Sequence, residues 1–376
     1  MSDPLPETVL QFGTGKFLRC FVDLFVDEAN RGCGQPLGRV VAVQSTGSER
    51  ARSINAQQGR YHVVIRGLAG GERVDRTLEV AGVSRALAAG DDWPGVLEVA
   101  RSEPLRLVVS NTTEAGLALD ESDAPGGGPP RSFPAKLLAV LLARQEAGLE
   151  GVTILPCELV DGNADRLREL VLVQAGRWQV PASQADWVRD ACRWHNTLVD
   201  RIVSAPPAGD PLAERDPLYA VAEPFALWLI EGTPDLGSLA EHPAVQLVED
   251  LAPYALRKVR ILNGAHTALV AKARRLGFET VREAVADTAV RAWLEELLFE
   301  EIIPTIADRV EQADAEQFAR DVLERFANPF LDHRLADIAL HHDVKLGTRL
   351  VPTSEEYRER FGRAPRLLGD VLEFSQ

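Results

Sequence analysis

A glycine turn near the N-terminus limits the possible folds more than any other part of the chain. The residues TVLQF (8–12) predict a strand, and residues 16–31 carry apolar side chains at helical spacing. A second, β-branched run, RVVAVQST (39–46), predicts a strand that is buried on both faces. A strand, a glycine turn, a helix and a second strand, in this order, form a mononucleotide-binding half of a doubly wound sheet.

The turn itself, FGTGKFLRC (12–20), is incomplete as a dinucleotide fingerprint. Gly13 and Gly15 occupy the first two glycine positions, but Leu18 stands where the third glycine would be. That third glycine normally allows the helix to pack closely on the strand. Taken alone, the turn fits either a cofactor site or an ordinary connection between a strand and a helix.

Further strand patterns follow the turn, and then the chain becomes helical. Residues 60–68 and 76–83 predict an inserted hairpin, and residues 106–114, 151–159 and 218–231 predict further strands. From about Val245 to the end the pattern is almost wholly helical. We therefore expect an α/β fold: a Rossmann-like N-terminal domain (1–248) with a mostly parallel sheet, and a mainly α-helical domain (249–376) for substrate binding and catalysis.

The carboxyl ends of the predicted parallel strands carry polar residues. Gln44, Asn111 and Thr112 lie at or just after the ends of two of these strands, and the stretch 156–159 ends a third. Ligands of open α/β sheets bind outside the carboxyl ends of the strands. We expect these residues to share one edge of the sheet with the glycine turn.

Composition excludes several classes of partner. The 376 residues carry a formal net charge of −15, spread along the chain, which repels polyanions and argues against nucleic acid and anionic membranes. No run approaches the roughly 18 apolar residues of a membrane span, and the N-terminus does not resemble a signal peptide. The four cysteines show no CxxC spacing, so we expect reduced, mostly buried thiols and no metal. The expected location is the cytoplasm.

In the helical half, Lys258, Asn263 and His266 lie on one half of a predicted helix, within the stretch 252–273. A lysine with a lowered pKa can move a hydroxyl proton, and burial together with the neighbouring Arg257 and Arg260 would lower it. An asparagine amide and a neutral histidine can bind the same oxygen. The alternative is a solvated helix face, because a lysine flanked by arginines is usually exposed.

Six blocks of sequence, in order, resemble the polyol-specific long-chain dehydrogenases, the mannitol dehydrogenase family. KVRILNGAH resembles the family's K-x4-N-x2-H signature, and the glycine turn resembles its G-x-G-x-F-x-R form, which has no third glycine. The other blocks are VVSNTTEAG, WHNTLVDRIVS, AEPFALWLIE and RFANPFLDHRLADIA. Within the family, QSTGS (44–48) and LPCELVDGN (155–163) are most similar to the uronate branch.

The resemblance implies a role for particular residues. Lys258 would be the general acid/base, with Asn263 and His266 binding the reacting oxygen. Residues expected to lie against the dinucleotide are Gly13, Thr14, Gly15, Phe17, Gln44, Asn111 and Thr112. Residues expected to reach the substrate are Arg201, His333 and Lys345, although Asp200 and Arg201 could equally brace the structure.

Two departures from the family pattern concern the proton path. Mannitol-type members have an asparagine as a second donor to the oxyanion, and Leu159 at that position cannot donate. Ala255, three residues before Lys258, leaves no carboxylate for a proton relay. These departures also motivate a different interpretation, a non-catalytic dinucleotide-binding sensor.

The expected reaction is the reduction of a hexuronate ketone, tagaturonate to altronate. Fructuronate reduction and polyol 2-dehydrogenation are the alternatives. Cations that could pair with the substrate carboxylate are Arg201, Arg257, Lys345 and Arg349. The second strand ends without an acid for a ribose hydroxyl or an arginine for a phosphate, which leaves NAD and NADP open. The resemblance implies NAD, a sugar acid or polyol as substrate, and a monomer or small homo-oligomer.

Overall fold

The computed structural model describes residues 5–32, 35–112, 116–126 and 128–373. The chain forms two compact units. Unit 1 comprises Met1–Ile65, Arg76–Ala222 and Ala226–Leu251, and unit 2 comprises Arg66–Asp75, Glu223–Phe225 and Ala252–Gln376. Within the described ranges, no helix combines the length and the apolar character needed to cross a membrane.

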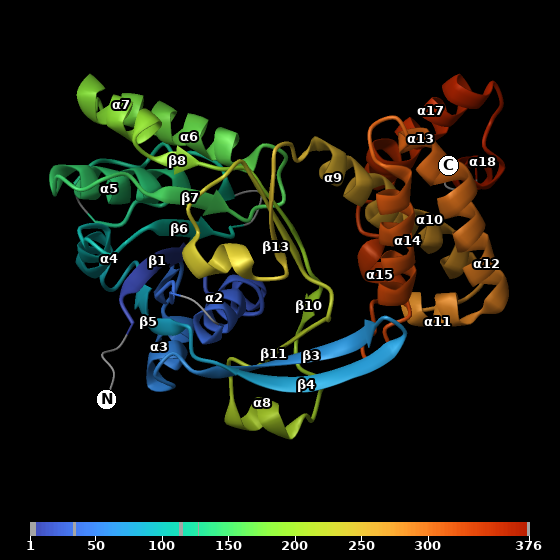
Figure 1. Ribbon diagram of the computed structural model, residues 1–376, viewed down its shortest axis with the longest axis horizontal. Helices are drawn as coiled ribbons and strands as arrows, with labels where there is room; N and C mark the ends of the chain where they lie inside the picture. Colours follow the sequence, from blue (N-terminus) through green and yellow to red (C-terminus); the bar gives the residue numbers. More distant parts are fainter. Residues whose placement is uncertain (1–4, 33–34, 113–115, 127, 374–376) are drawn as a thin grey trace. The chain divides into compact units, whose positions relative to one another are not determined.

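Unit 1 is built on a six-stranded sheet in the order β5-β2-β1-β6-β7-β8, in which every neighbouring pair is parallel (Figure 1). The strands are β1 (Glu7–Phe12), β2 (Arg39–Gln44), β5 (Val83–Ala88), β6 (Leu107–Ser110), β7 (Thr153–Pro156) and β8 (Arg193–Trp194). β6 and β7 are buried throughout, as expected for strands covered on both faces. The predicted Rossmann-like class is confirmed.

Helices cover this sheet. They are α2 (Val22–Arg31), α3 (Glu49–Ala56), α4 (Trp93–Ala100), α5 (Phe133–Glu146), α6 (Asn163–Arg177) and α7 (Ala182–Asp190). Apolar residues of α4, α5, α6 and α7 form one core with Leu10 and Phe12 of β1. Asp92 and Ser132 cap α4 and α5 by accepting backbone N–H bonds, and a proline follows each cap in the first turn.

Two smaller sheets lie wholly or mostly in unit 1. One has the order β10-β11-β3-β4, with β3 (Tyr61–Ala69), β4 (Glu72–Val80), β10 (Val203–Ser204) and β11 (Ala220–Ala222). The other has the order β13-β12-β9, with β9 (Thr197–Asp200), β12 (Leu227–Glu231) and β13 (Val245–Val248). The short helices α8 (Pro211–Arg215) and η2 (Gly237–Glu241) lie in the connections.

Four details of individual elements differ from the expectations. The helix expected over 16–31 is interrupted after α1 (Lys16–Arg19), because Phe21 leaves the helical backbone conformation (φ −129°, ψ −92°). The strand expected over 218–231 is two strands in different sheets. The inserted hairpin expected over 60–68 and 76–83 is present as β3 and β4, but the following strand of the main sheet, β5, was not predicted. The region after Val245 begins with the strand β13, so the helical part starts only at Ala252.

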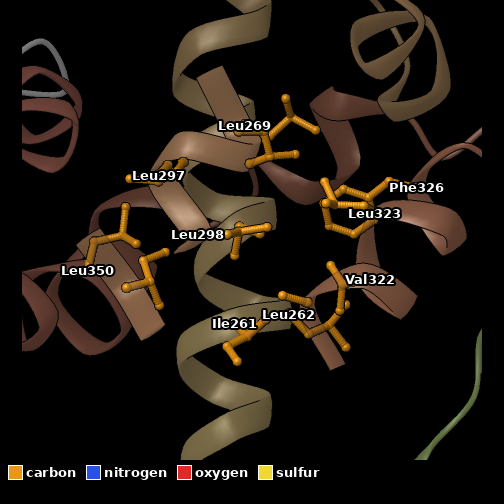
Figure 2. Packing of buried hydrophobic residues seen from close by; sticks show 14 of the residues in the cluster. Ile261, Leu262, Leu269, Leu297, Leu298, Val322, Leu323, Phe326 and Leu350 are labelled. Atoms are coloured by element: carbon orange, nitrogen blue, oxygen red, sulfur yellow. The ribbon is translucent and has the colours of Figure 1, made fainter. Parts of the chain in front are cut away.

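Unit 2 is helical apart from the tip of the β3–β4 hairpin and residues 223–225. Its elements are α9 (Ala252–Arg257), η3 (Lys258–Asn263), α10 (Gly264–Arg275), α11 (Val281–Ala286), α12 (Thr288–Glu296), η4 (Leu297–Ile302), α13 (Ile303–Ile306), α14 (Gln312–Phe326), α15 (Leu335–Ile338), α16 (His342–Lys345), η5 (Leu346–Leu350), α17 (Val351–Phe361) and α18 (Arg366–Glu373). Figure 2 shows Ile261 and Leu269 of the central helix packing among Leu298, Leu323 and Leu350.

Candidate active site

The glycine turn follows β1 at the carboxyl edge of the main sheet. Gly13 has φ 128°, and a Cβ atom there would lie 2.9 Å from Cδ1 of Leu18 and 3.2 Å from the carbonyl oxygen of Asn111. Gly15 has an ordinary φ of −66°, and a Cβ atom there would have nothing within 4 Å. The chain path therefore requires glycine at position 13, whereas position 15 leaves open space at the start of α1.

Leu18, in the third glycine position, is buried and fills the space beside Gly13. Two further side chains, Arg19 and Gln11, hold the turn in place through hydrogen bonds. Arg19 donates from Nη1 to the carbonyl oxygen of Thr14 (2.6 Å) and from Nη2 to that of Leu218 (3.0 Å), and Gln11 donates to that of Gly13 (3.1 Å). The arginine of the G-x-G-x-F-x-R block thus holds the shape of the turn.

A buried acid lies next to this brace. The Tyr61 hydroxyl contacts both Oδ2 of Asp23 (2.9 Å) and the carbonyl oxygen of Arg19 (3.2 Å). Burial raises the pKa of the Asp23 carboxyl to about 7, against hydrogen bonds from Tyr61 and Gln11 and the charge of Arg19, which lower it. The carboxylate Oδ1 has no hydrogen-bond partner among the described residues. Asp23 falls within an ordinary amphipathic helix pattern, so no sequence signal distinguishes it.

Three residues expected to bind the cofactor, Gln44, Asn111 and Phe17, make hydrogen bonds or ring contacts with their neighbours. Gln44 accepts from the backbone N–H of Ala51 (2.8 Å) and donates to the carbonyl oxygen of Thr46 (2.8 Å), which shapes the loop after β2. Asn111 donates to the carbonyl oxygen of Cys157 (2.7 Å). Phe17 of α1 stacks on Phe21, with ring centroids 4.8 Å apart.

Glu158 joins the ends of β6 and β7. Its carboxylate accepts from the backbone N–H of Thr112 (2.8 Å) and from the Ser110 hydroxyl (3.1 Å), and the residue is buried. Burial raises its pKa, against these hydrogen bonds. This role of Glu158 was not predicted from the sequence, although an acid directly after a buried strand is a signal for it. Residues 113–115 of the VVSNTTEAG block lie outside the described residues.

Other predicted features of unit 1 concern Arg201, Leu159 and the thiols. Arg201 donates to the carbonyl oxygen of Cys20 (2.8 Å) and lies over the Phe25 ring (5.8 Å), an arrangement that fits the bracing role. Leu159 is 67% exposed. Cys20, Cys157 and Cys192 are free and buried, and Cys33 lies outside the described residues. The described chain contains no cluster of three or more His, Cys, Asp or Glu residues suited to a metal ion.

In unit 2, Lys258, Asn263 and His266 lie on one continuous helix formed by α9, η3 and α10. The sequence pattern predicts an α-helix here, but η3 is a π-helix that begins at Lys258 and ends at Asn263. A π-helix closes its hydrogen bonds from residue i to i+5. The five-residue spacing therefore places Lys258 and Asn263 one turn apart on the same side, closer together than in an α-helix.

His266 is a neutral histidine in a buried position. Its ring stacks on Phe326 (centroids 4.1 Å apart, planes at 28°) and meets His333 edge-on (5.1 Å, 77°). Its pKa is lowered well below the ordinary value by burial and then by the nearby His333, Arg325, Arg349 and Lys345. Its Nε2 is buried without a hydrogen-bond partner among the described residues. A buried nitrogen left open in this way is suited to a ligand oxygen.

The structure brings two more of the predicted residues to His266. His333 contacts its ring, and Lys345 contributes to the positive potential around it. Burial lowers the pKa of His333, and burial and then Arg349 lower that of Lys345. Lys345 donates from Nζ to the carbonyl oxygen of Ile338 (2.7 Å). His333 and Lys345 therefore belong to the same region of unit 2 as His266.

The two arginines expected to lower the pKa of Lys258 are engaged elsewhere. Arg260 is buried and pairs with Glu356 (2.7 Å), and it also donates to the Thr353 hydroxyl (2.7 Å). The Arg257 guanidinium lies over the Phe318 ring at 4.4 Å. The charge of Arg260 is therefore compensated by a carboxylate, and the expected effect of the two arginines on Lys258 stays a prediction.

A parallel sheet with a braced glycine turn at its carboxyl edge defines unit 1 as a Rossmann-type domain, and unit 2 adds a helical domain with a polar helix face. The mannitol dehydrogenase Rossmann domain model matches residues 7–241, and the mannitol dehydrogenase C-terminal domain model matches residues 250–371. The chain belongs to the mannitol dehydrogenase family. The family resemblance predicted from the sequence is confirmed.

Relatives cover nearly the whole chain. It is 39% identical to altronate oxidoreductase of Bacillus subtilis (98% of this chain, 78% of the relative) and 41% identical to altronate oxidoreductase of Halalkalibacterium halodurans (98% and 74%). Among solved structures, a substrate-free D-sorbitol dehydrogenase matches with a TM-score of 0.81 (24% identity, 95% of this chain, 77% of that chain). Pseudomonas fluorescens mannitol 2-dehydrogenase, in a ternary complex with NAD and D-mannitol, matches with a TM-score of 0.77 (22% identity, 99% and 78%). These two structures share the fold.

Proposed function

We propose that this chain catalyses the NAD-dependent interconversion of tagaturonate and altronate. The curated relatives named altronate oxidoreductase share 37–41% of its residues over 98% of its length. The structural observation that carries the proposal is the neutral His266. Its buried Nε2 has no hydrogen-bond partner among the described residues, and its surroundings are positively charged. A neutral imidazole can bind a carbonyl or hydroxyl oxygen, and positive charge around it suits an acidic sugar.

Unit 1 has the features that a dinucleotide needs. The open space at Gly15 leaves room for a pyrophosphate to approach the backbone, and Gly13 gives the tight turn below it. Gln44, Asn111 and Thr112 would line the same carboxyl edge, with Phe17 at the start of α1. When bound, NADH supplies the hydride for the reaction.

The proposed roles in unit 2 follow from the chemistry of each group. Lys258 would give a proton to the ketone oxygen as the carbon accepts the hydride, and would take it back in the oxidation of altronate. Asn263 would donate its amide N–H to the developing alkoxide, and His266 would hold the same oxygen. One hydride and one proton convert the ketone to a secondary alcohol, and NADH becomes NAD⁺. His333 and Lys345 would contact the substrate.

A substrate panel tests the proposal. Tagaturonate, fructuronate, fructose and fructose 6-phosphate are offered to the purified protein with NADH, and separately with NADPH, and the consumption of reduced cofactor is followed. We expect the highest kcat/KM with tagaturonate and NADH. Activity on fructose alone would contradict the uronate assignment, and NADH binding without any turnover would instead support the non-catalytic sensor.

A variant separates chemistry from binding. Replacing Lys258 with methionine removes the proton donor while keeping an unbranched side chain, and a general acid/base is worth about 10²–10⁴-fold in rate. We expect kcat to fall by about this factor with NADH affinity unchanged. An unchanged kcat would remove Lys258 from the mechanism.

The proposal includes a cytoplasmic location and a monomer or small homo-oligomer.

A further inference from the structure

Among the described residues, Lys345 and Arg349 of unit 2 have no acidic partner. Lys345 and Arg349 lie four residues apart, at the end of α16 and within η5. Lys345 donates to a backbone carbonyl, and Arg349 donates from Nη1 to the Thr267 hydroxyl (3.2 Å). In the part of the chain that the structure describes, neither forms an ion pair with a carboxylate. Burial lowers the pKa of Arg349.

Other arginines of the same unit are satisfied differently. Arg325 is buried and bonds Glu223 through two nitrogens (3.0 and 2.7 Å), and Arg260 is buried and pairs with Glu356. A buried or half-buried charge without a counter-charge is unfavourable in the folded protein. Arg349 and Lys345 therefore differ from the structural arginines, and an anion that binds beside them would supply the missing charge.

Arg349 is linked to the proposed oxygen-binding residues. The Thr267 hydroxyl that accepts from Arg349 also donates to the carbonyl oxygen of Asn263 (2.8 Å). Arg349 and Lys345 both lower the pKa of His266, the residue that precedes Thr267. Leu350 packs closely on this helix, since its Cδ2 lies 3.6 Å from a Cβ built at Gly264 (Figure 2). The two cations are thus anchored beside the helix that carries Asn263 and His266.

We infer that Arg349, assisted by Lys345, binds the carboxylate of the sugar acid and makes this chain select a uronate over a neutral keto sugar. A guanidinium can offer two parallel N–H donors to a carboxylate, and only one of its nitrogens is used by Thr267. The inference rests on the proposed function, and it chooses Arg349 and Lys345 among the four cations that the sequence left open. The planar carboxylate is the anion to which we commit, with phosphate as a tested alternative.

The test compares Arg349→Gln, Arg349→Lys and the wild-type protein on tagaturonate, fructose and fructose 6-phosphate. We expect kcat/KM for tagaturonate to fall about 100-fold or more in Arg349→Gln, chiefly through KM, because truncating one partner of a desolvated charge pair is costly. The value for fructose should change less than about threefold. Arg349→Lys keeps the charge but not the paired donors, and should recover part of the loss. Arg274→Gln, which removes an exposed charge from α10, is the matched control and should resemble the wild type.

The outcomes separate the two claims. Equal losses on tagaturonate and fructose in a folded Arg349→Gln protein would refute the inference and leave the proposed function standing. A wild-type protein without turnover of any uronate would refute the proposed function and the inference with it. A wild-type preference for fructose 6-phosphate that Arg349→Gln abolishes would assign the cations to phosphate. Thermal melting of each variant, with and without altronate, shows whether a loss comes from unfolding.

Discussion

Lys258 and Asn263 are the first and last residues of one π-helical segment, η3. In an α-helix, residues five apart differ by about 140 degrees around the axis. In a π-helix the hydrogen bond itself spans five residues, so the two side chains emerge on the same side. Single π-turns inside α-helices are frequent at functional sites. The relative orientation of the lysine and the asparagine around the helix therefore depends on that local irregularity.

Inserting an alanine after Val259 should separate Lys258 from Asn263 around the helix and lower turnover. The insertion lengthens the spacing from five residues to six, and one added α-helical residue rotates Lys258 by about 100 degrees relative to Asn263. α9, which rotates with it, contains no buried residue, so little packing is lost. We expect kcat to fall by about 10²–10⁴-fold, as for loss of the proton donor, with helix content unchanged by circular dichroism. Wild-type turnover in the lengthened protein would show that the spacing does not position Lys258.

Two alanine substitutions separate the structural and ligand-binding glycines of the turn. Gly13→Ala places a Cβ at φ 128° and against Leu18, and should destabilise the fold by about 1–3 kcal/mol. In Gly15→Ala the new Cβ has no atom within 4 Å and the backbone has an ordinary φ. The free energy of unfolding measured with denaturant should therefore change by less than about 1 kcal/mol. NADH affinity should nevertheless fall about tenfold or more in Gly15→Ala, because the new methyl group occupies the space proposed for the pyrophosphate. Unchanged affinity would place the cofactor elsewhere.

His266 should act as a neutral group throughout the physiological range. Because its pKa lies well below the ordinary value, the imidazole carries no charge above about pH 6.5. We expect His266→Gln, which keeps a neutral hydrogen-bonding group, to retain more kcat than His266→Ala. The pH profile of kcat/KM in the wild type should show no inflection from this residue between pH 6.5 and 8. An inflection in that interval, absent from His266→Gln, would show that the histidine is charged during turnover.

The sequence predicted the parts of the fold that come from regular patterns. The apolar runs of β1, β2, β6 and β7 and the glycine turn between β1 and α1 were sufficient to infer a parallel sheet with a nucleotide-binding turn. The long apolar run after Leu218 was misjudged, because Pro224 has no N–H for a sheet ladder and residues 223–225 belong to unit 2. A proline within the run was the signal that one strand could not continue.

The sequence offered candidate residue types for the site but not their geometry. The K-x4-N-x2-H spacing identified Lys258, Asn263 and His266, yet nothing in that spacing distinguishes a π-turn from an α-helix. Whether an arginine has a carboxylate partner also depends on contacts between residues distant in sequence. Arg260 meets Glu356 and Arg349 meets Thr267 only after folding, so their different roles could not be derived from the sequence.

Asp23 should make the protein lose stability as the pH rises from about 4 to 7. Its pKa is about 7 in the folded protein and near 3.8 in the unfolded chain. Across this interval the folded state holds more protons than the unfolded state, so the free energy of unfolding falls with increasing pH. The difference of about 3 units sets an upper limit of about 4 kcal/mol on the loss, which is complete above pH 7.

Asp23→Asn removes this titration while keeping the size of the side chain. Relative to the wild type, the variant should gain stability between pH 5 and pH 8 in denaturant unfolding. Asp190→Asn is the control, because Asp190 is exposed and its pKa is lowered by Arg189, which keeps it charged across the same interval. Parallel pH profiles for the wild type and Asp23→Asn would mean that Asp23 is already charged in the folded protein at pH 5, and that the Tyr61 and Arg19 contacts outweigh its burial.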